Sequence, residues 1–113
     1  MIPHAPVDPR TAALLDLIAG DPRHAEHRAI VVQAIVETAD EWGGLVHTNC
    51  YRPKLTNHLG HYVVTPCVVG ATVASLRRAG ALEFVEWVPT EGSRTGNTGR
   101  LSPLYRLTDR TAA

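Results

Sequence analysis

Residues 65–82, TPCVVGATVASLRRAGAL, contain the signals of a complete helix and the start of a following strand. Thr65 is a typical N-cap residue, and Pro66 suits the first helical position, where its missing N–H is not needed. Gly80 is a typical residue just beyond a helix C-terminus. The pattern therefore predicts a helix over 65–79, followed by a strand from about residue 81.

The two faces of this helix are expected to differ in character. Val69, Val73 and Leu76 recur at offsets of four and three, which predicts the buried stripe. The remaining positions carry mostly small residues and one cation, so they are expected to face outward. These outer positions are Cys67, Val68, Ala71, Thr72, Ser75 and Arg78. A second cation, Arg77, is expected nearer the buried side, where it favours the helix C-terminus.

A β-hairpin is predicted after the helix. Residues 81–88 and 101–107 alternate between apolar and polar side chains, as antiparallel strands do. The segment between them is rich in glycine and carries Arg94, Asn97 and Arg100. Glycine and asparagine favour turns, so residues 89–100 are predicted to form the hairpin loop.

The N-terminal half is predicted to be helical. Residues 1–7 read as a flexible arm before a single domain over 8–110. Asp8 and Pro9 begin a first helix that extends to about residue 19, and Asp21 begins a second that ends before Gly43 and Gly44. Residues 45–47 are expected to be extended. A small helix, capped by Thr48 or Asn49, then precedes a polar connection over 56–64.

The order of these elements from Glu26 to Thr108 resembles that of the winged helix-turn-helix superfamily. The phrase LRRAGAL at 76–82 looks like the end of a recognition helix in that superfamily. The stretches at 93–100 and 103–108 are similar to the wing and return strand of small regulatory proteins of actinobacteria and their phages. The resemblance implies an α+β fold, with a three-helix core, a hairpin wing and an extra N-terminal helix.

The resemblance also implies a function, namely duplex DNA binding by a regulator of transcription or of phage or mobile-element physiology. Such proteins place the recognition helix in the major groove and the wing on phosphates or the minor groove. Carried onto this sequence, the contacts come from the 65–79 helix, from the preceding helix and from the 89–100 wing. The implied DNA-binding residues are Arg52, Lys54, Thr65, Cys67, Val68, Ala71, Thr72, Ser75, Arg78, Arg94, Asn97 and Arg100.

Charge is distributed unevenly along the 113 residues, although the formal net charge is zero. Residues 1–45 carry seven acidic and three basic side chains, whereas residues 46–113 carry eight basic and four acidic ones. The second half, with a net charge of +4, fits a surface that faces a polyanion. Small differences of this kind are also common without any function.

The predicted outer face holds few side chains that read base edges, since arginine, lysine, asparagine and glutamine make most specific contacts. Readout through phosphates and DNA shape is therefore expected to dominate. The alternative is a winged-helix protein-interaction module, an adaptor or inhibitor that binds no DNA. The N-terminal helix either forms a homodimer or covers the core of one chain.

Other functional classes have weaker support. Cys50, His58, His61 and Cys67 lack the tight ligand pairs of most structural zinc sites, so neither a metal nor another cofactor is expected. A Cys50–His47 pair has no accompanying acid or oxyanion loop, so an enzyme is not expected. The sequence shows no membrane span and no secretory signal, which predicts a cytoplasmic protein.

Overall fold

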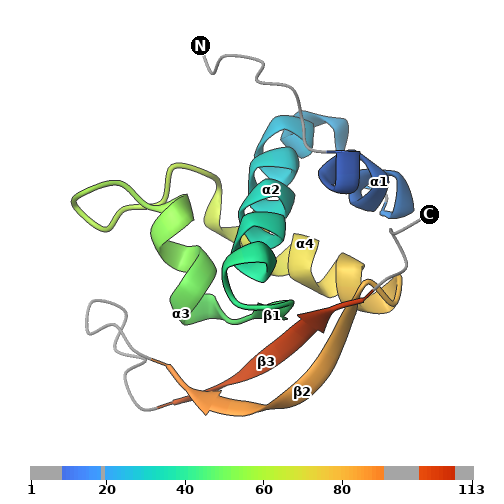
Figure 1. Cartoon of the computed structure of the whole chain (residues 1–113). Helices are drawn as coiled ribbons and strands as arrows, with labels where there is room; N and C mark the ends of the chain where they lie inside the picture. Colours follow the sequence, from blue (N-terminus) through green and yellow to red (C-terminus); the bar gives the residue numbers. More distant parts are fainter. Residues whose placement is uncertain (1–8, 19, 91–99, 109–113) are drawn as a thin grey trace.

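The computed structural model describes residues 9–18, 20–90 and 100–108, which form an α+β fold with a three-stranded antiparallel sheet (Figure 1). The order of helices and strands is the predicted one. With η marking a 3-10 helix, the elements are α1 (Pro9–Leu17), η1 (Pro22–His24), α2 (Ala25–Glu41), β1 (Leu45–Val46), α3 (Thr48–Tyr51), η2 (Arg52–Leu55), α4 (Pro66–Arg78), β2 (Leu82–Pro89) and β3 (Leu101–Leu107).

Helix α1 packs on α2 and belongs to the core of the chain. Leu14 is fully buried, and Leu15 packs against the same cluster. Arg10 ties the two helices together on the outside, because its guanidinium donates to both carboxylate oxygens of Asp40 at 2.5 and 2.6 Å. Leu17 stays 44% exposed. Covering the core is thus one role of this helix, and a homodimer through it stays a prediction.

The ends of α2 follow the predicted signals. The Asp21 carboxylate accepts a hydrogen bond from the Arg23 N–H at 2.9 Å and so begins the η1 turn that leads into the helix. After Glu41 the chain reverses at Gly43 and Gly44, whose φ angles are +64° and +95°. Side chains other than glycine rarely adopt such angles. These two glycines therefore fix the turn that leads into β1.

The cap of α3 differs from the prediction. Thr48 or Asn49 is the cap that the sequence predicts, but the helix begins at Thr48 and its N-cap is His47. Its imidazole Nδ1 accepts a hydrogen bond from the Asn49 N–H at 3.1 Å. A buried histidine can replace a hydroxyl or carboxylate cap because a neutral imidazole nitrogen is also an acceptor.

The sheet has the strand order β1-β3-β2, with β3 in the middle. Val46 lies opposite Tyr105, and Leu82 lies opposite Leu107. A bulge interrupts the β2–β3 ladder between Phe84 and Glu86. Bulges bend a strand and increase its twist, and in Figure 1 the β2–β3 hairpin curves beneath the helices.

The core lies between the helices and the sheet. It is made by side chains from all four α-helices or the segments adjoining them, together with the three strands. Its buried members are Leu14, Val31, Val32, Ala34, Ile35, Val36, Ala39, Val46, Leu55, Val64, Val68, Val69, Leu76, Ala81, Leu82 and Tyr105. Trp42 and Trp87 lie outside this core, and each is 59% exposed. Within the described residues, no helix has the length and apolar character needed to cross a membrane.

Candidate nucleic-acid interface

Helix α4 is placed by its buried stripe, which packs against α2 and β2. The stripe consists of Val68, Val69, Thr72 and Leu76. Val68, Thr72 and Leu76 follow one another at intervals of four residues, so they stack along one side of the helix. The helix ends as predicted, since Gly80 has a φ angle of +80°.

This burial corrects the predicted phase of the helix. Val68 and Thr72 were expected on the outer face, but only 6% and 1% of their surfaces are exposed. The buried stripe is rotated toward them and away from Val73, which is half-buried. Threonine has the shape of valine, so Thr72 fits a position that faces the core. Neither Val68 nor Thr72 can therefore be a DNA contact in this arrangement.

Other predicted outer positions do face solvent. Cys67, Ala71 and Arg78 are exposed, as expected. Ser75 is half-buried, and its hydroxyl accepts a hydrogen bond from Arg78 Nη2 at 3.2 Å. Arg77, which was expected nearer the buried side, is exposed as well. The end of α4 therefore presents two adjacent cations.

A groove of about 770 Å³ lies between α4, the α3–η2 segment and the base of the β2–β3 hairpin. α4 contributes residues between Gly70 and Arg78, and β3 contributes residues from its first part. The groove is lined by Thr48, Tyr51, Arg52, Gly70, Val73, Ala74, Arg77, Arg78, Thr90, Arg100, Leu101, Ser102, Pro103 and Tyr105. Segments that are far apart in the sequence thus form one concave surface.

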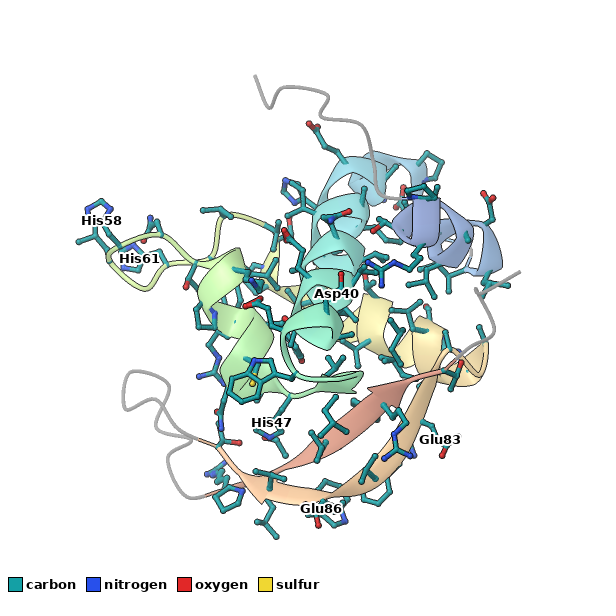
Figure 2. All side chains as sticks on the ribbon, in the orientation of Figure 1. Asp40, His47, His58, His61, Glu83 and Glu86 are labelled. Atoms are coloured by element: carbon teal, nitrogen blue, oxygen red, sulfur yellow. The ribbon has the colours of Figure 1, made fainter. Side chains whose placement is uncertain are left out.

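The groove is strongly basic. Four of its lining residues are arginines, and none of the described lining residues is acidic. Arg77, Arg78 and Arg100 are exposed and have no carboxylate within ion-pair distance in the described part of the chain. Figure 2 shows Glu83 and Glu86 on the side of β2 that faces away from the helices. Positive charge is therefore concentrated on the concave side.

Hydrogen bonds hold the walls of the groove together. Asn49 Nδ2 of α3 donates to the Pro89 carbonyl oxygen at 3.1 Å and so links the helix to the hairpin. The Thr90 N–H donates to the Arg100 carbonyl oxygen at 2.7 Å, and the Thr90 and Ser102 hydroxyls are also hydrogen-bonded. These bonds fix the base of the hairpin, and with it the backbone of Arg100, relative to α3.

Arg52 is the predicted residue of the preceding helix that does line the groove. It is half-buried, and its Nη2 donates to the Thr48 hydroxyl at 3.3 Å. Tyr51 lies beside it, and burial raises the pKa of its phenol above the usual value. The hydrogen bond to Thr48, four residues earlier, holds the Arg52 side chain in the wall of the groove.

Lys54 and Thr65, predicted to contact phosphate, have partners elsewhere. Lys54 Nζ forms an ion pair with Glu41 of α2, whose carboxylate raises the pKa of the lysine. The Thr65 N–H donates to His27 Nδ1 at 2.9 Å, and the Thr65 hydroxyl lies 3.1 Å from the same nitrogen. Thr65 occupies the N-cap position of α4, but its side chain makes no capping hydrogen bond. Its N–H is thus not free for phosphate.

Two predicted wing residues, Arg94 and Asn97, lie outside the described residues. Arg77 lines the groove, although the sequence pattern places it only at the helix C-terminus and not among the DNA-binding residues. A signal for it exists in the sequence: Gly70, Ala74 and Arg77 are spaced by four and three residues. This spacing places them on one helix face, which is the face that lines the groove.

The cysteines and histidines that carry the weak metal pattern lie apart in the structure. Cys67 is exposed and Cys50 is half-buried. Figure 2 shows His58 and His61 at the outer end of the connection between η2 and α4, away from the other labelled side chains. The described ranges contain no group of three or more histidine, cysteine, aspartate or glutamate residues placed to hold a metal ion.

Comparisons of this chain with protein-family models, with curated proteins and with solved structures found no significant match. The geometry and charge of the groove are therefore the basis for a functional assignment.

Proposed function

We propose that this chain is a winged helix-turn-helix protein that binds duplex DNA in the arginine groove, the groove lined by Arg52, Arg77, Arg78 and Arg100. The observation that carries the proposal is the gathering of four arginines, with no acidic side chain among the described lining residues, between a helix and a hairpin. Duplex DNA is densely negative and holds condensed counterions. Arginines that contact its phosphates release these counterions, which favours binding.

The shape of α4 supports this proposal. A helix of 13 residues is about 20 Å long, and a helix of that kind fits the DNA major groove. Its exposed positions Gly70 and Ala71, and the half-buried Ala74, have little or no side chain, so the helix backbone can approach the DNA closely. Arg77 and Arg78 at one end, with Arg100 on the hairpin, then flank the helix as phosphate contacts.

Sequence discrimination through α4 is expected to be weak. The described exposed face offers no asparagine or glutamine, and the hydroxyl of Thr72 is buried. Side-chain contacts with base edges supply most direct readout, whereas phosphate contacts carry no sequence information. We therefore propose a binder that uses backbone charge and DNA shape. Its role as a transcription, phage or mobile-element regulator is part of this proposal.

A binding role fits the chemistry of the groove better than a catalytic one. The described lining residues supply guanidinium groups and hydroxyls, but no histidine, cysteine, aspartate or glutamate. General acid–base catalysis most often uses those residue types. Guanidinium groups and hydroxyls instead suit the recognition of phosphate oxygens.

A protein-binding role is the second candidate, because the hairpin exposes aromatic side chains. Phe84 and Trp87 form an edge-to-face pair with ring centroids 5.3 Å apart, and they are 40% and 59% exposed. Exposed aromatic clusters are typical of protein interfaces. An adaptor that uses this surface would not need the arginine groove, which separates the two candidates experimentally.

Fluorescence anisotropy with a random-sequence duplex, measured over a salt series, tests the proposal. With up to four phosphate contacts, the plot of log affinity against log salt is expected to have a slope of about −3 to −4. Replacing Arg77 and Arg78 together by glutamine should reduce the magnitude of that slope by about 2. Arg106→Gln is the matched control, because Arg106 is exposed on β3 opposite Glu83.

The control variant should bind DNA with nearly the slope of the wild type. No binding at low salt would contradict the proposal. So would a double variant that binds with unchanged affinity and slope. In either case, the protein-binding alternative would be tested next by replacing Trp87.

A further inference from the structure

A second cavity lies on a different side of α4 from the arginine groove. It has a volume of about 130 Å³ and lies between α4 and the segment that leads from α1 into α2. Val68, Thr72 and Ser75 line it from α4. Gly20, His24 and Arg28 line it from the other side.

The wall of this cavity contains a buried hydroxyl without a partner. Thr72 is 1% exposed, and its Oγ1 has no hydrogen-bond partner among the described residues. Thr38, the comparable buried threonine of α2, donates instead to the Ala34 carbonyl oxygen at 2.8 Å. Leaving a buried hydroxyl unpaired is unfavourable. The cavity wall therefore holds a hydroxyl whose hydrogen-bonding capacity is unused within the described residues.

Arg28 supplies a positive charge at the same cavity. Its guanidinium donates only to the Asp21 carbonyl oxygen within the described part of the chain, through long hydrogen bonds of 3.3 and 3.4 Å. It therefore retains donors for another acceptor, since a guanidinium carries five. The Asp21 carboxylate also lies at this cavity, but it is engaged by Arg23, whose Nη2 donates to it at 2.7 Å.

The position of the guanidinium depends on a glycine. A Cβ atom added to Gly20 would collide with the Arg28 guanidinium. The φ angle of Gly20 is not in the left-handed region, so alanine there would move the arginine without straining the backbone. The missing side chain of Gly20 thus leaves the space in which Arg28 sits beside the cavity.

We propose that this cavity binds a small oxyanion, a carboxylate or a phosphate, with Arg28 as its charged partner and Thr72 as a hydroxyl donor. A volume of 130 Å³ corresponds to about four water molecules, which suits a group of acetate or phosphate size. His24 and Ser75 at the same cavity can donate further hydrogen bonds. The site is separate from the arginine groove, so its existence does not depend on DNA binding.

An effect of the oxyanion on DNA affinity would rest on the proposed function. Ala71 and Ser75 line the oxyanion cavity, whereas Gly70 and Ala74 of the same helix line the arginine groove. An oxyanion that fixes α4 from one side would therefore act on the helix that is proposed to contact DNA. This effect on DNA affinity is a separate measurement from the binding of the oxyanion itself.

Two-dimensional amide NMR of the labelled chain tests the site, with sodium acetate and inorganic phosphate titrated as separate probes at constant ionic strength. Saturable shifts are expected at the amides of Arg28, Thr72 and Ser75 for at least one probe. The two titrations show whether the site prefers a carboxylate or a phosphate. Shifts confined to residues of the arginine groove, or no saturable shift at all, would overturn the proposal.

Three variants test the named contacts. Arg28→Gln and Gly20→Ala should each weaken binding roughly tenfold or more, because a hydrogen bond to a charged group is lost or displaced. Thr72→Val should also weaken binding while leaving the fold intact, as a thermal melt without the probe would show. Arg77→Gln is the control and should bind like the wild type. Unchanged affinity in all three cavity variants would overturn the proposal, whatever the outcome of the DNA titration.

Discussion

Replacing Leu14 by alanine tests whether α1 is part of the core of a single chain. Leu14 is fully buried in the main cluster, although it lies on a helix that the resemblance treats as an addition. Leucine-to-alanine changes at such sites remove buried methyl groups and leave a cavity, and they cost about 2–5 kcal/mol. Domains of this size are stable by about 5–15 kcal/mol, so the loss is a large fraction of the total.

The matched control is Leu17→Ala, one turn further along the same helix. Leu17 is 44% exposed, and substitutions at exposed positions usually change stability by about 0.5 kcal/mol or less. At roughly 4 °C for each kcal/mol, Leu14→Ala should lower the melting temperature by about 8–20 °C. Leu17→Ala should shift it by only about 2 °C.

Urea titrations followed by circular dichroism supply the measurement, at two protein concentrations. Leu14→Ala should lower the midpoint without changing the slope. If Leu17→Ala were as damaging as Leu14→Ala, and if stability rose with protein concentration, α1 would serve a dimer. A cost below about 1 kcal/mol for Leu14→Ala would refute the reasoning from burial.

Three further predictions concern single contacts. His27→Ala removes the acceptor of the Thr65 N–H and should cost about 1–3 kcal/mol in urea unfolding; a stable variant would contradict this role, and His27→Asn should recover part of the loss. Arg10 holds the pKa of Asp40 below its usual value, so this contribution to stability is present above about pH 4 and is lost at lower pH. The stability difference between the wild type and Asp40→Asn should therefore shrink on acidification, and a constant difference would contradict the pairing. Burial raises the pKa of Tyr51, so its contribution is lost as pH rises above about 10, and Tyr51→Phe should lack that alkaline loss. Identical alkaline profiles of the two proteins would show that Tyr51 does not titrate with unfolding.

The order and the ends of the elements could be read from the sequence because local residues determine them. Pro66 begins α4, and Gly80 ends it with a positive φ angle. Gly43 and Gly44 likewise mark the turn after α2. Such signals act through backbone sterics within a few residues. They therefore do not depend on the distant parts of the chain.

The rotation of α4 could not be read in the same way. Valine, threonine and alanine occur on several faces of α4. A stripe through Val69 and Val73 therefore differs little in hydrophobicity from one through Val68 and Thr72. The choice between them depends on how α2 and β2 pack against the helix. The groove also could not be predicted from the sequence, because Arg52, Arg77 and Arg100 come together only through the tertiary fold.

The partners of two predicted contact residues are also set by tertiary structure. The sequence predicts Lys54 as a phosphate contact, but in the folded chain Lys54 forms an ion pair with Glu41. The sequence predicts Thr65 as a capping residue, but its side chain makes no capping hydrogen bond and its N–H donates to His27. In both cases a long-range partner replaced the local or external one that the residue type suggests.

Amide NMR of the labelled chain with an unlabelled random-sequence duplex at low salt shows directly whether the arginine groove binds DNA. If it does, shifts should cluster at the exposed positions of α4, at Arg52 and at residues 100–103, and they should disappear when salt is raised. The amides of α1, which contributes no lining residue to the groove, should stay unmoved. Salt-resistant shifts at Phe84 and Trp87 with an unmoved groove, or no shifts at all, would contradict the assignment of the arginine groove as a DNA-binding surface.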